Sequence, residues 1–547
     1  MLQLLTSLIL ISTGFTEEQS FLRKGDVILT VGDSVTAQGV YQEYMQTILD
    51  TLYPDQSIRV VNVGVGGMKA DGGLQVMKSQ LKKSEATIVT VMFGVNDTMW
   101  NSAQAEAKAK AFATNISAIL DEAAKQKIPV ILLRESHFSH GNQADAWVDQ
   151  MNKTLETILA AGDNLAAKRN VPVIDVLGAY KSALKRAWIA DPKYEFTPDV
   201  IHPTQPGHAA IAAEILRALG AGLPLSSKER GPVRPMTNPP LKLFAASGYG
   251  IIPGQDVPLV AHFMSRTKQP LKGEGLLVVG NAVQKMNLQM DQGETQDMIL
   301  KLMPGAANRW GCFPLYMAFK SKNTFHAAHT FVYFSKVHAA SNGPLKLSAK
   351  HFRLTQGKSE KASPVTDVSV TLDDAVKFKF RWMDKTVVPA QPGFKTRFGK
   401  QINVALDLES RGGQPCDAIE IFIDTRPDES TGRPTANADA NPEGVVRLGV
   451  HRVKKGNEFA AELLRPEGVT TAMAQLAEIE PNLYEVTFRS SIESLIGITM
   501  RVTDTETYGV GKGRIYDLTG RKHVSLEPMS FIRMSKTKSG IFFRVGY

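Results

Sequence analysis

The stretch Val27-Ile28-Leu29-Thr30-Val31-Gly32-Asp33-Ser34 decides the fold of the N-terminal part of this chain. Its first five residues are apolar or β-branched, which is typical of a strand buried on both faces. Gly32 and Asp33 then end the run and leave Ser34 just beyond the carboxyl end of the strand, where open α/β sheets place their chemistry. Because Gly-Asp-Ser is also an ordinary turn, the interpretation of Ser34 as a nucleophile depends on partner residues elsewhere in the chain.

A serine nucleophile needs a base, a group that orients that base, and donors for an oxyanion. Asp199-Val200-Ile201-His202-Pro203 supplies a carboxylate and an imidazole three residues apart, which one bend of the chain brings to the same side. Pro203 disfavours helical geometry at His202 and keeps that residue in a loop. His208 is the competing imidazole, but it lies within the helix expected to begin near Pro206, so His202 is the predicted base.

Two further loops follow apolar strands and offer donors for an oxyanion. Asn62-Val63-Gly64-Val65-Gly66-Gly67 follows the strand expected at 58–61, and its glycines leave backbone N–H groups unobstructed. Gly94-Val95-Asn96-Asp97 follows the strand expected at 87–93, and Asn96 offers a side-chain amide. The alternatives are a simple turn role for Gly67, with Gly66 next to it, and a helix-capping role for Asn96.

The four sequence blocks, taken in chain order, end in or contain Ser34, Gly67, Asn96 and His202. They resemble those of the SGNH/GDSL-type esterases, serine hydrolases with a flavodoxin-like sheet. The resemblance covers roughly residues 24–220 and implies that Ser34 is the nucleophile and donates its backbone N–H to the oxyanion hole. By the same resemblance, Gly67 is the backbone donor, Asn96 the side-chain donor, Asp199 the acid and His202 the base. Val35-Thr36 departs from the family, which often carries leucine or isoleucine after the serine; this difference concerns packing and not the chemistry.

Strand and helix signals alternate over residues 24–222, which predicts a parallel sheet with right-handed crossovers and helices on both faces. Further strands are expected at 128–133 and 171–176. Helices are expected at 40–52, 69–82, 103–127, 144–168 and 205–219.

The remainder of the chain reads as β-structure. Five prolines between residues 221 and 240 predict a linker over 223–240, and short apolar runs then predict an immunoglobulin-like β-sandwich over 241–356. Residues 365–547 resemble the family-9-like carbohydrate-binding fold, also a β-sandwich, which implies binding of a polysaccharide or a cell surface. Residues 421–427 and 502–504 carry that resemblance. Trp310 and Trp382 are candidates for stacking on sugar rings, with a place in the core as the alternative.

Composition limits the partners of the protein. The chain of 547 residues has a formal net charge of +9, spread along its length without a basic cluster or a nucleic-acid motif, so no nucleic-acid partner is predicted. An anionic polysaccharide or an envelope component is the alternative partner that the positive charge allows. Residues 1–16 resemble a signal peptide, although no Lys or Arg precedes the apolar run, and this predicts a secreted, periplasmic or envelope-located protein. No stretch is long enough for a transmembrane helix.

No metal or organic cofactor is predicted. The sequence lacks a His-Glu-x-x-His pattern, and Lys69 interrupts the glycine pattern that a dinucleotide-binding loop would need. Cys312 and Cys416 lie far apart and form neither a disulfide framework nor a metal cluster pattern. A structural Ca²⁺ in the C-terminal domain is compatible with the sequence.

The residues and the resemblance together predict a serine esterase that hydrolyses small acyl esters, acetyl above all, on a carbohydrate polymer. An esterase or lysophospholipase acting on lipid acyl chains is the alternative within the same chemistry. A catalytically silent polysaccharide-binding or adhesion protein is the alternative from another class.

Overall fold

The computed structural model describes most of the hydrolase-like region and the strands of the rest of the chain. The described residues are 18–139, 145–190, 197, 200–235, 241–245, 249–252, 257–266, 270–280, 282–302, 311–321, 324–348, 352–356, 363–384, 387, 417–425, 445–455, 458–465, 468–489, 495–504, 514–517, 532–536 and 540–545. The expected signal peptide at 1–16 and Asp199 lie outside them.

The N-terminal domain is built on a parallel sheet of five strands in the order β2-β1-β3-β4-β5. This is the strand order of flavodoxin-like folds, so the predicted parallel sheet is confirmed. Strands β1, β3 and β4 are buried along their whole length, as their apolar sequences predict. The strands are β1 (Val27–Gly32), β2 (Arg59–Asn62), β3 (Ile88–Met92), β4 (Val130–Leu133) and β5 (Val173–Ile174).

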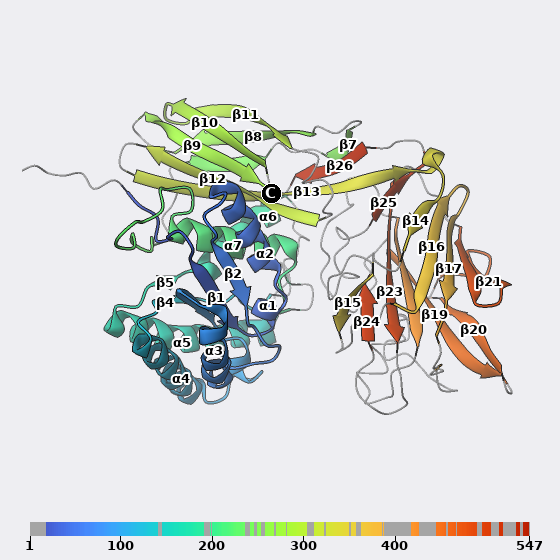
Figure 1. Ribbon diagram of the computed structural model, residues 1–547, viewed down its shortest axis with the longest axis horizontal. Coiled ribbons are helices and arrows are strands. Elements are labelled where there is room, and N and C mark those ends of the chain that lie inside the picture. Colours follow the sequence, from blue (N-terminus) through green and yellow to red (C-terminus); the bar gives the residue numbers. More distant parts are fainter. Residues whose placement is uncertain are drawn as a thin grey trace, which may run out of the picture.

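Helices cover both faces of this sheet (Figure 1). Because successive strand residues point to opposite faces, Ile28 joins a core with α2, α6 and α7, whereas Leu29 joins a core with α3, α4 and α5. The helices are α1 (Ser34–Ala37), α2 (Val40–Leu52), α3 (Ala70–Ser84), the short 3₁₀ helix η1 (Asn96–Thr98), α4 (Ala105–Lys125), α5 (Ala146–Arg169), α6 (Val176–Ala190) and α7 (Gln205–Leu219).

Helix α6 is not predicted by the sequence, in which 171–176 reads as one strand. The strand β5 ends at Ile174, and the Asp175 carboxylate accepts a hydrogen bond from the backbone N–H of Gly178 at 2.9 Å. An aspartate in this position satisfies a free N–H of the first helical turn, so the chain turns into a helix before the apolar run is finished.

Helix α7 is buried on nearly every side. It packs against α2, α6 and β5 of its own domain, and against β12 (Gly311–Ser321) and β13 (Thr324–Ala339) on its other side. The alanines at positions 209, 210, 212, 213 and 218 are 0–1% exposed and let the neighbouring elements approach closely. One hydrophobic core therefore runs from the parallel sheet through α7 into the central strands.

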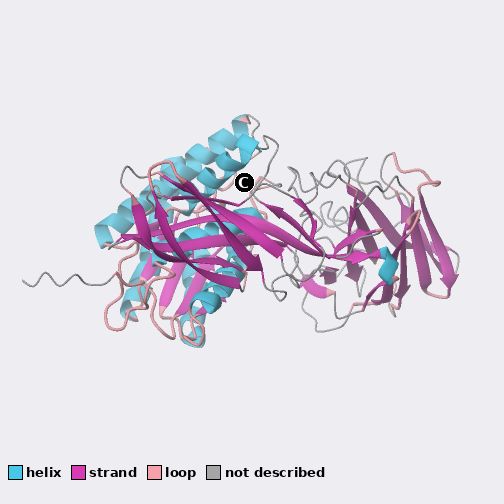
Figure 2. Cartoon of the chain, turned by 90° about the horizontal axis from the view of Figure 1, so that it is seen from above, coloured by secondary structure: helices cyan, strands magenta, loops and turns pink. Residues whose placement is uncertain are grey.

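The central region consists of antiparallel strands (Figure 2). One sheet of three strands contains β6 (Leu241–Ala245), β8 (Val257–Ser265) and β11 (Thr295–Leu302). The strands β9 (Leu271–Val279) and β10 (Ala282–Met290) pair with β12 and β13 in a larger sheet.

The segment that joins the N-terminal domain to these strands folds back onto the domain it leaves. The Arg230 guanidinium donates to both carboxylate oxygens of Asp26 at 2.7 Å, and also to the carbonyl of Phe21 at 2.9 Å. The Asp26 side chain is only 3% exposed, so Arg230 neutralises a buried charge next to the start of β1.

The C-terminal region is also rich in antiparallel strands. One sheet contains β14 (Leu345–Leu347), β16 (Val365–Leu372), β17 (Val376–Trp382), β21 (Ala474–Glu480) and β22 (Leu483–Phe488). The larger sheet continues through β13 into β18 (Ala418–Asp424), β19 (Val445–Lys455), β20 (Glu458–Leu464), β23 (Leu495–Asp504) and β25 (Ile532–Ser535), joined at its side by β7 (Tyr249–Ile252), β15 (Arg353–Gln356), β24 (Arg514–Asp517) and β26 (Gly540–Val545).

Trp382 belongs to the core of this region and does not offer a surface for a sugar ring. It is fully buried, and the Arg452 guanidinium lies 4.4 Å from the centre of its ring. Trp310 and Cys416 lie outside the described residues, and Cys312 is part of β12.

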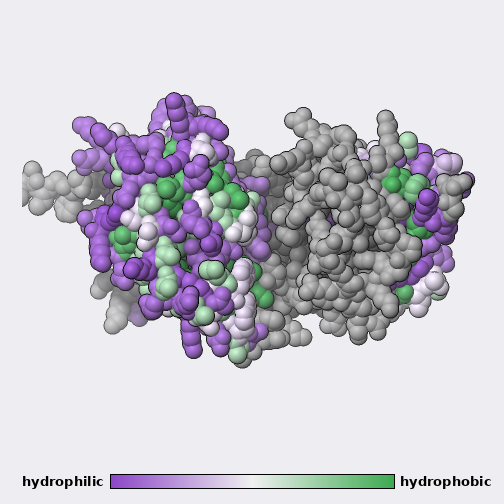
Figure 3. All heavy atoms as spheres, turned by 90° about the horizontal axis from the view of Figure 1, so that it is seen from below, coloured by the Kyte–Doolittle hydropathy of each residue, from purple (hydrophilic) through white to green (hydrophobic). Residues whose placement is uncertain are grey.

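Two further results concern membranes and metals. Over the described ranges, no helix is both long and apolar enough to span a bilayer. In the same ranges, no group of three or more His, Cys, Asp or Glu side chains is arranged to hold a metal ion. Seen from below, the described surface is mainly hydrophilic, with hydrophobic residues in small separate patches (Figure 3).

Candidate active site

Ser34 and His202 meet at the carboxyl end of β1. The Nε2 atom of His202 lies 2.8 Å from the Oγ atom of Ser34, within hydrogen-bond distance. Ser34 is the first residue of α1, and Asp33 caps that helix by accepting a hydrogen bond from the N–H of Val35 at 2.9 Å. The fold therefore brings a hydroxyl and an imidazole together from positions 168 residues apart.

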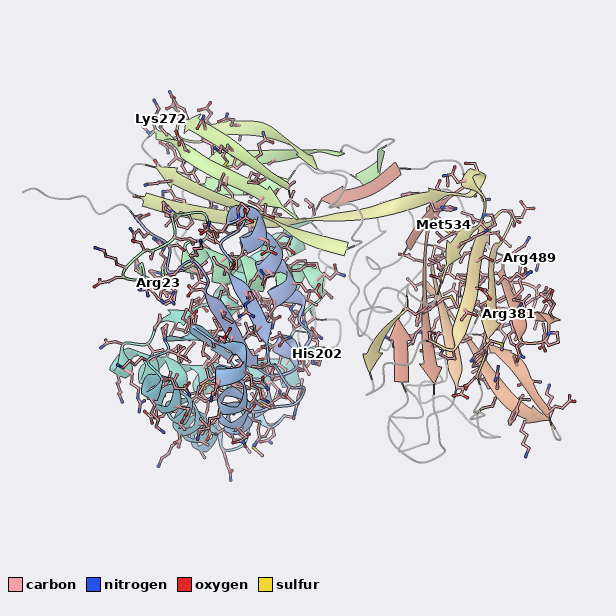
Figure 4. The ribbon with its side chains drawn as sticks, in the orientation of Figure 1. Arg23, His202, Lys272, Arg381, Arg489 and Met534 are labelled. Atoms are coloured by element: carbon pink, nitrogen blue, oxygen red, sulfur yellow. The ribbon has the colours of Figure 1, made fainter. Side chains whose placement is uncertain are left out.

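The loop that carries His202 is fixed on both sides. After it, α7 begins at Gln205 with Pro206 in its first turn, as the prolines predict. Before it, Val200 has a φ of +77°, which is costly for a β-branched residue, and its carbonyl accepts the N–H of Ser139 at 3.0 Å. His202 is labelled in Figure 4, at the edge of the N-terminal domain.

His208, the competing imidazole, contacts the C-terminal end of α1 and not Ser34. Its Nε2 atom lies 2.6 Å from Oε1 of Gln38, and its ring stacks on Tyr41. His208 is 1% exposed on α7 and belongs to the packing of that helix. Of the two imidazoles, His202 is the one placed next to the Ser34 hydroxyl.

Gly67 lies in an exposed turn beside the serine loop. Its φ of +73° is in the left-handed region, which favours glycine. A Cβ atom there would meet no atom within 4 Å, so the requirement for glycine is conformational and not steric. Gly64, by contrast, allows close approach, because a Cβ atom at that position would lie 2.4 Å from the backbone nitrogen of Ala37.

Asn96 joins the serine loop to the glycine loop. Its Nδ2 group donates to Oδ2 of Asp33 at 2.9 Å and to the carbonyl of Met68 at 3.1 Å. Three of the four loops predicted to carry the site therefore come together, because Asn96 is bonded to the other two. Both amide hydrogens are engaged, so an oxyanion would have to share or replace one of these bonds.

Asp97 holds the start of α3. Both of its carboxylate oxygens lie within 3.3 Å of the Ala70 N–H, one of the unpaired donors of the first turn. Burial, with the nearby charges of Asp71 and Asp33, raises the pKa of Asp97 to about 7, although the bond from Ala70 and Lys69 both oppose this shift.

Glu135 is a site residue that the sequence does not reveal. It is completely buried after β4, and its Oε2 atom accepts the N–H of Val95 at 2.6 Å. Its carboxyl lies next to that of Asp33, and each group affects the pKa of the other. The available signal was its position two residues after an apolar strand, at the same edge of the sheet as Ser34 and Asn96.

Comparison with known proteins identifies the family of the N-terminal domain. Residues 30–210 match the GDSL-like lipase/acylhydrolase family. The N-terminal domain is a GDSL/SGNH hydrolase domain. The protein is accordingly a carboxylic ester hydrolase. An acetylxylan esterase from Geobacillus stearothermophilus is 25% identical to it over 217 residues, which are 36% of this chain and 94% of that protein.

Solved structures also match part of the chain. A gut microbial diltiazem-metabolizing enzyme is 17% identical, with a TM-score of 0.34, over 50% of this chain and 72% of its own. A catalytic mutant of an acetylxylan esterase from Geobacillus stearothermophilus is 21% identical, with a TM-score of 0.31, over 38% of this chain and 99% of its own. An α/β hydrolase from the metagenome of Lake Arreo, Spain, is 21% identical, with a TM-score of 0.31, over 38% of this chain and 100% of its own.

Proposed function

We propose that this esterase works by two-step acyl transfer on Ser34, with His202 as the base and Asp199 as the acid that orients it. The contact of 2.8 Å between His202 Nε2 and Ser34 Oγ carries this proposal. His202 would take the hydroxyl proton as Ser34 attacks the ester carbonyl, and would then return it to the leaving alcohol. Water would release the acyl group from Ser34 by the same route.

In this mechanism the charge on the carbonyl oxygen is stabilised by the backbone N–H groups of Ser34 and Gly67 and by the amide of Asn96. The hydrogen bond from Asn96 to the Met68 carbonyl is the longer of its two, at 3.1 Å against 2.9 Å to Asp33. We infer that the oxyanion takes over the hydrogen now given to Met68. Asp33 then continues to hold the amide in place.

The proposed substrate is a small acyl ester, acetyl above all, on a carbohydrate polymer. The name of the Geobacillus relative, an acetylxylan esterase, supports this choice. So do two tryptophans: Trp100 and Trp147 are 44% and 41% exposed, and each contacts the Phe138 ring edge-on, at 5.9 and 5.7 Å. Exposed aromatic rings of this kind suit the apolar faces of sugar rings.

These aromatic residues are connected to the catalytic loops. Trp100 lies four residues after Asn96, and both Met99 and Trp100 adopt positive φ values, 52° and 58°. Such backbone conformations are uncommon outside glycine, and they concentrate at functional sites. Phe138 belongs to the same apolar cluster as Val200, which lies two residues before His202.

A lipid ester is the second candidate, because Met99 and Val65 are also exposed, at 55% and 43%. Kinetics on polymeric and simple substrates separates the two. For a sugar polymer, Trp100→Ala and Trp147→Ala should raise KM for acetylated polysaccharide and leave KM for a small aryl acetate unchanged. Hydrolysis of long-chain acyl esters in preference to acetylated polysaccharides would favour the lipid.

We also propose that the C-terminal region is a β-sandwich of the carbohydrate-binding type and that the protein is exported. The shared core between β16–β17–β22 and β18–β19–β23 supports the sandwich arrangement. Pull-down of the full chain by insoluble polysaccharides tests the binding. Cell fractionation and N-terminal sequencing of the mature protein test the export.

Labelling by a fluorophosphonate tests the catalytic proposal itself. We expect the wild-type chain to be labelled, and the Ser34→Ala variant to be neither labelled nor active. Release of acetate from a panel of acetylated polysaccharides then identifies the polymer. An unlabelled wild-type chain without esterase activity would favour the binding-protein alternative.

A further inference from the structure

Two carboxyl groups, those of Asp33 and Glu135, lie next to each other beside Asn96, which belongs to the proposed oxyanion hole. Asp33 is 1% exposed and Glu135 is completely buried. None of the ion pairs among the described residues includes either of them. Two adjacent buried anions without a cation would be strongly unfavourable, so the pair needs another source of stability.

The hydrogen bonds around the pair indicate where a proton must lie. Asp33 accepts bonds from the Val35 N–H and the Asn96 amide, and Glu135 Oε2 accepts the Val95 N–H. Glu135 Oε1 is buried and receives no N–H from the described part of the chain. A contact between two carboxyl groups becomes a hydrogen bond when one of them carries a proton.

We propose that Asp33 and Glu135 share one proton and act together as positioning residues, which hold Asn96 and thereby the oxyanion hole in the catalytic geometry. The inference rests on the proposed role of Asn96. The pair fixes that residue through two hydrogen bonds. Asp33 accepts one from its side-chain amide, and Glu135 accepts one from the backbone N–H of the residue before it.

Glu135 carries the shared proton at neutral pH. Burial raises the pKa of Asp33, but Glu135, the two hydrogen-bond donors and the nearby His202 all oppose this shift by favouring its charged form. Burial and the charge of Asp33 together raise the pKa of Glu135 well above its usual range. The other titratable groups facing the pair are Asp97 from η1, His202 from the loop before α7, and Tyr41 from α2.

The arrangement has a consequence for activity at high pH. When Glu135 loses its proton, its carboxylate repels that of Asp33 and no longer donates to it. Asp33 and the amide that it holds are then free to shift, so kcat should fall at alkaline pH. KM should change little, because this effect acts on the transition state and not on the bound ester.

Two variants of Glu135 test the proposal. Glu135→Gln keeps an acceptor for Val95 and a donor for Asp33 without a titratable group, so it should keep kcat near the wild-type value and lose the alkaline decline. Glu135→Ala removes both contacts, and should lower kcat by about 10²–10³ with KM unchanged, as loss of an oxyanion donor would. Asn96→Ala/Glu135→Ala should be no slower than Asn96→Ala alone, because both changes disable the same group.

Each outcome decides between the alternatives. Wild-type kcat in Glu135→Ala, an unchanged alkaline limb in Glu135→Gln, or multiplied losses in the double variant would overturn the proposal. If Glu135→Ala does not fold, the pH profile of Glu135→Gln still decides it. Ser34→Ala is the control that separates this inference from the proposed function. Activity in Ser34→Ala would refute the proposed catalysis. An inactive Ser34→Ala together with a normal Glu135→Ala would refute only this inference.

Discussion

The substitution Asp97→Asn should stabilise the hydrolase domain, and by an amount that grows with pH. Asp97 is 8% exposed, and both of its oxygens face the Ala70 N–H at the start of α3. An asparagine carbonyl can accept the same hydrogen bond without adding a buried charge. The substitution therefore isolates the cost of ionising this group from the value of its hydrogen bond.

The sign and size of the effect depend on the pKa of Asp97. In the folded protein that pKa is raised from 3.8 to about 7, so the native state holds the proton more tightly than the unfolded chain. The stability that protonated Asp97 supplies is complete below pH 3.8 and is lost as the pH rises to about 7. The whole loss is about 4 kcal/mol, of which about 3 kcal/mol falls between pH 5 and pH 8.

Thermal unfolding as a function of pH measures this difference. Since 1 kcal/mol shifts the Tm of a domain of this size by about 2–4 °C, the advantage of Asp97→Asn over wild type should be about 6–12 °C larger at pH 8 than at pH 5. Asp55→Asn, at an exposed turn position, is the matched control. An Asp97→Asn advantage that does not change with pH would refute the reasoning.

Three further predictions concern the site and its support. Asn96→Ala should lower kcat by about 10²–10³ with the fold intact, and a wild-type kcat would remove Asn96 from the mechanism. Gly67→Ala should cost about 1–2 kcal/mol in unfolding free energy and lower kcat, because its left-handed backbone must relax, whereas Gly66→Ala should leave kcat intact. Arg230→Met should destabilise the protein to urea by about 3–5 kcal/mol, since it leaves the buried Asp26 charge unpaired; a loss below 1 kcal/mol would contradict this.

The parallel sheet could be predicted from sequence because each strand is a short apolar run that ends in a turn. The loops after β1 and β3 could be located for the same reason, and the structure brings Ser34, His202 and Asn96 together there. The prediction of α4 at 103–127 differs from the observed Ala105–Lys125 by two residues at each end. Helix α6 was missed because the apolar run 171–176 continues past the point where Asp175 starts the helix.

Other features depend on contacts that no local pattern reveals. Glu135 looks like any charged residue after a strand, and only its burial against Asp33 makes it part of the site. The parallel pairing of β13 with β25 joins residues 337–339 to 533–535, nearly 200 positions away, and sequence periodicity cannot anticipate such a partner. Trp382 shows the same limit, since an aromatic residue in an alternating strand fits a core and a binding face equally well.

The enclosure of α7 limits how far the chain can be truncated without loss of a stable esterase. A gene cut after residue 222 would keep the nucleophile and the base, yet it would expose to water the side of α7 that now lies against β12 and β13. The helix α7, which begins three residues after His202, would lose one of the two surfaces that it packs against. The truncated protein should therefore aggregate or unfold. The smallest well-behaved esterase from this chain should therefore retain the central strands as part of its catalytic unit.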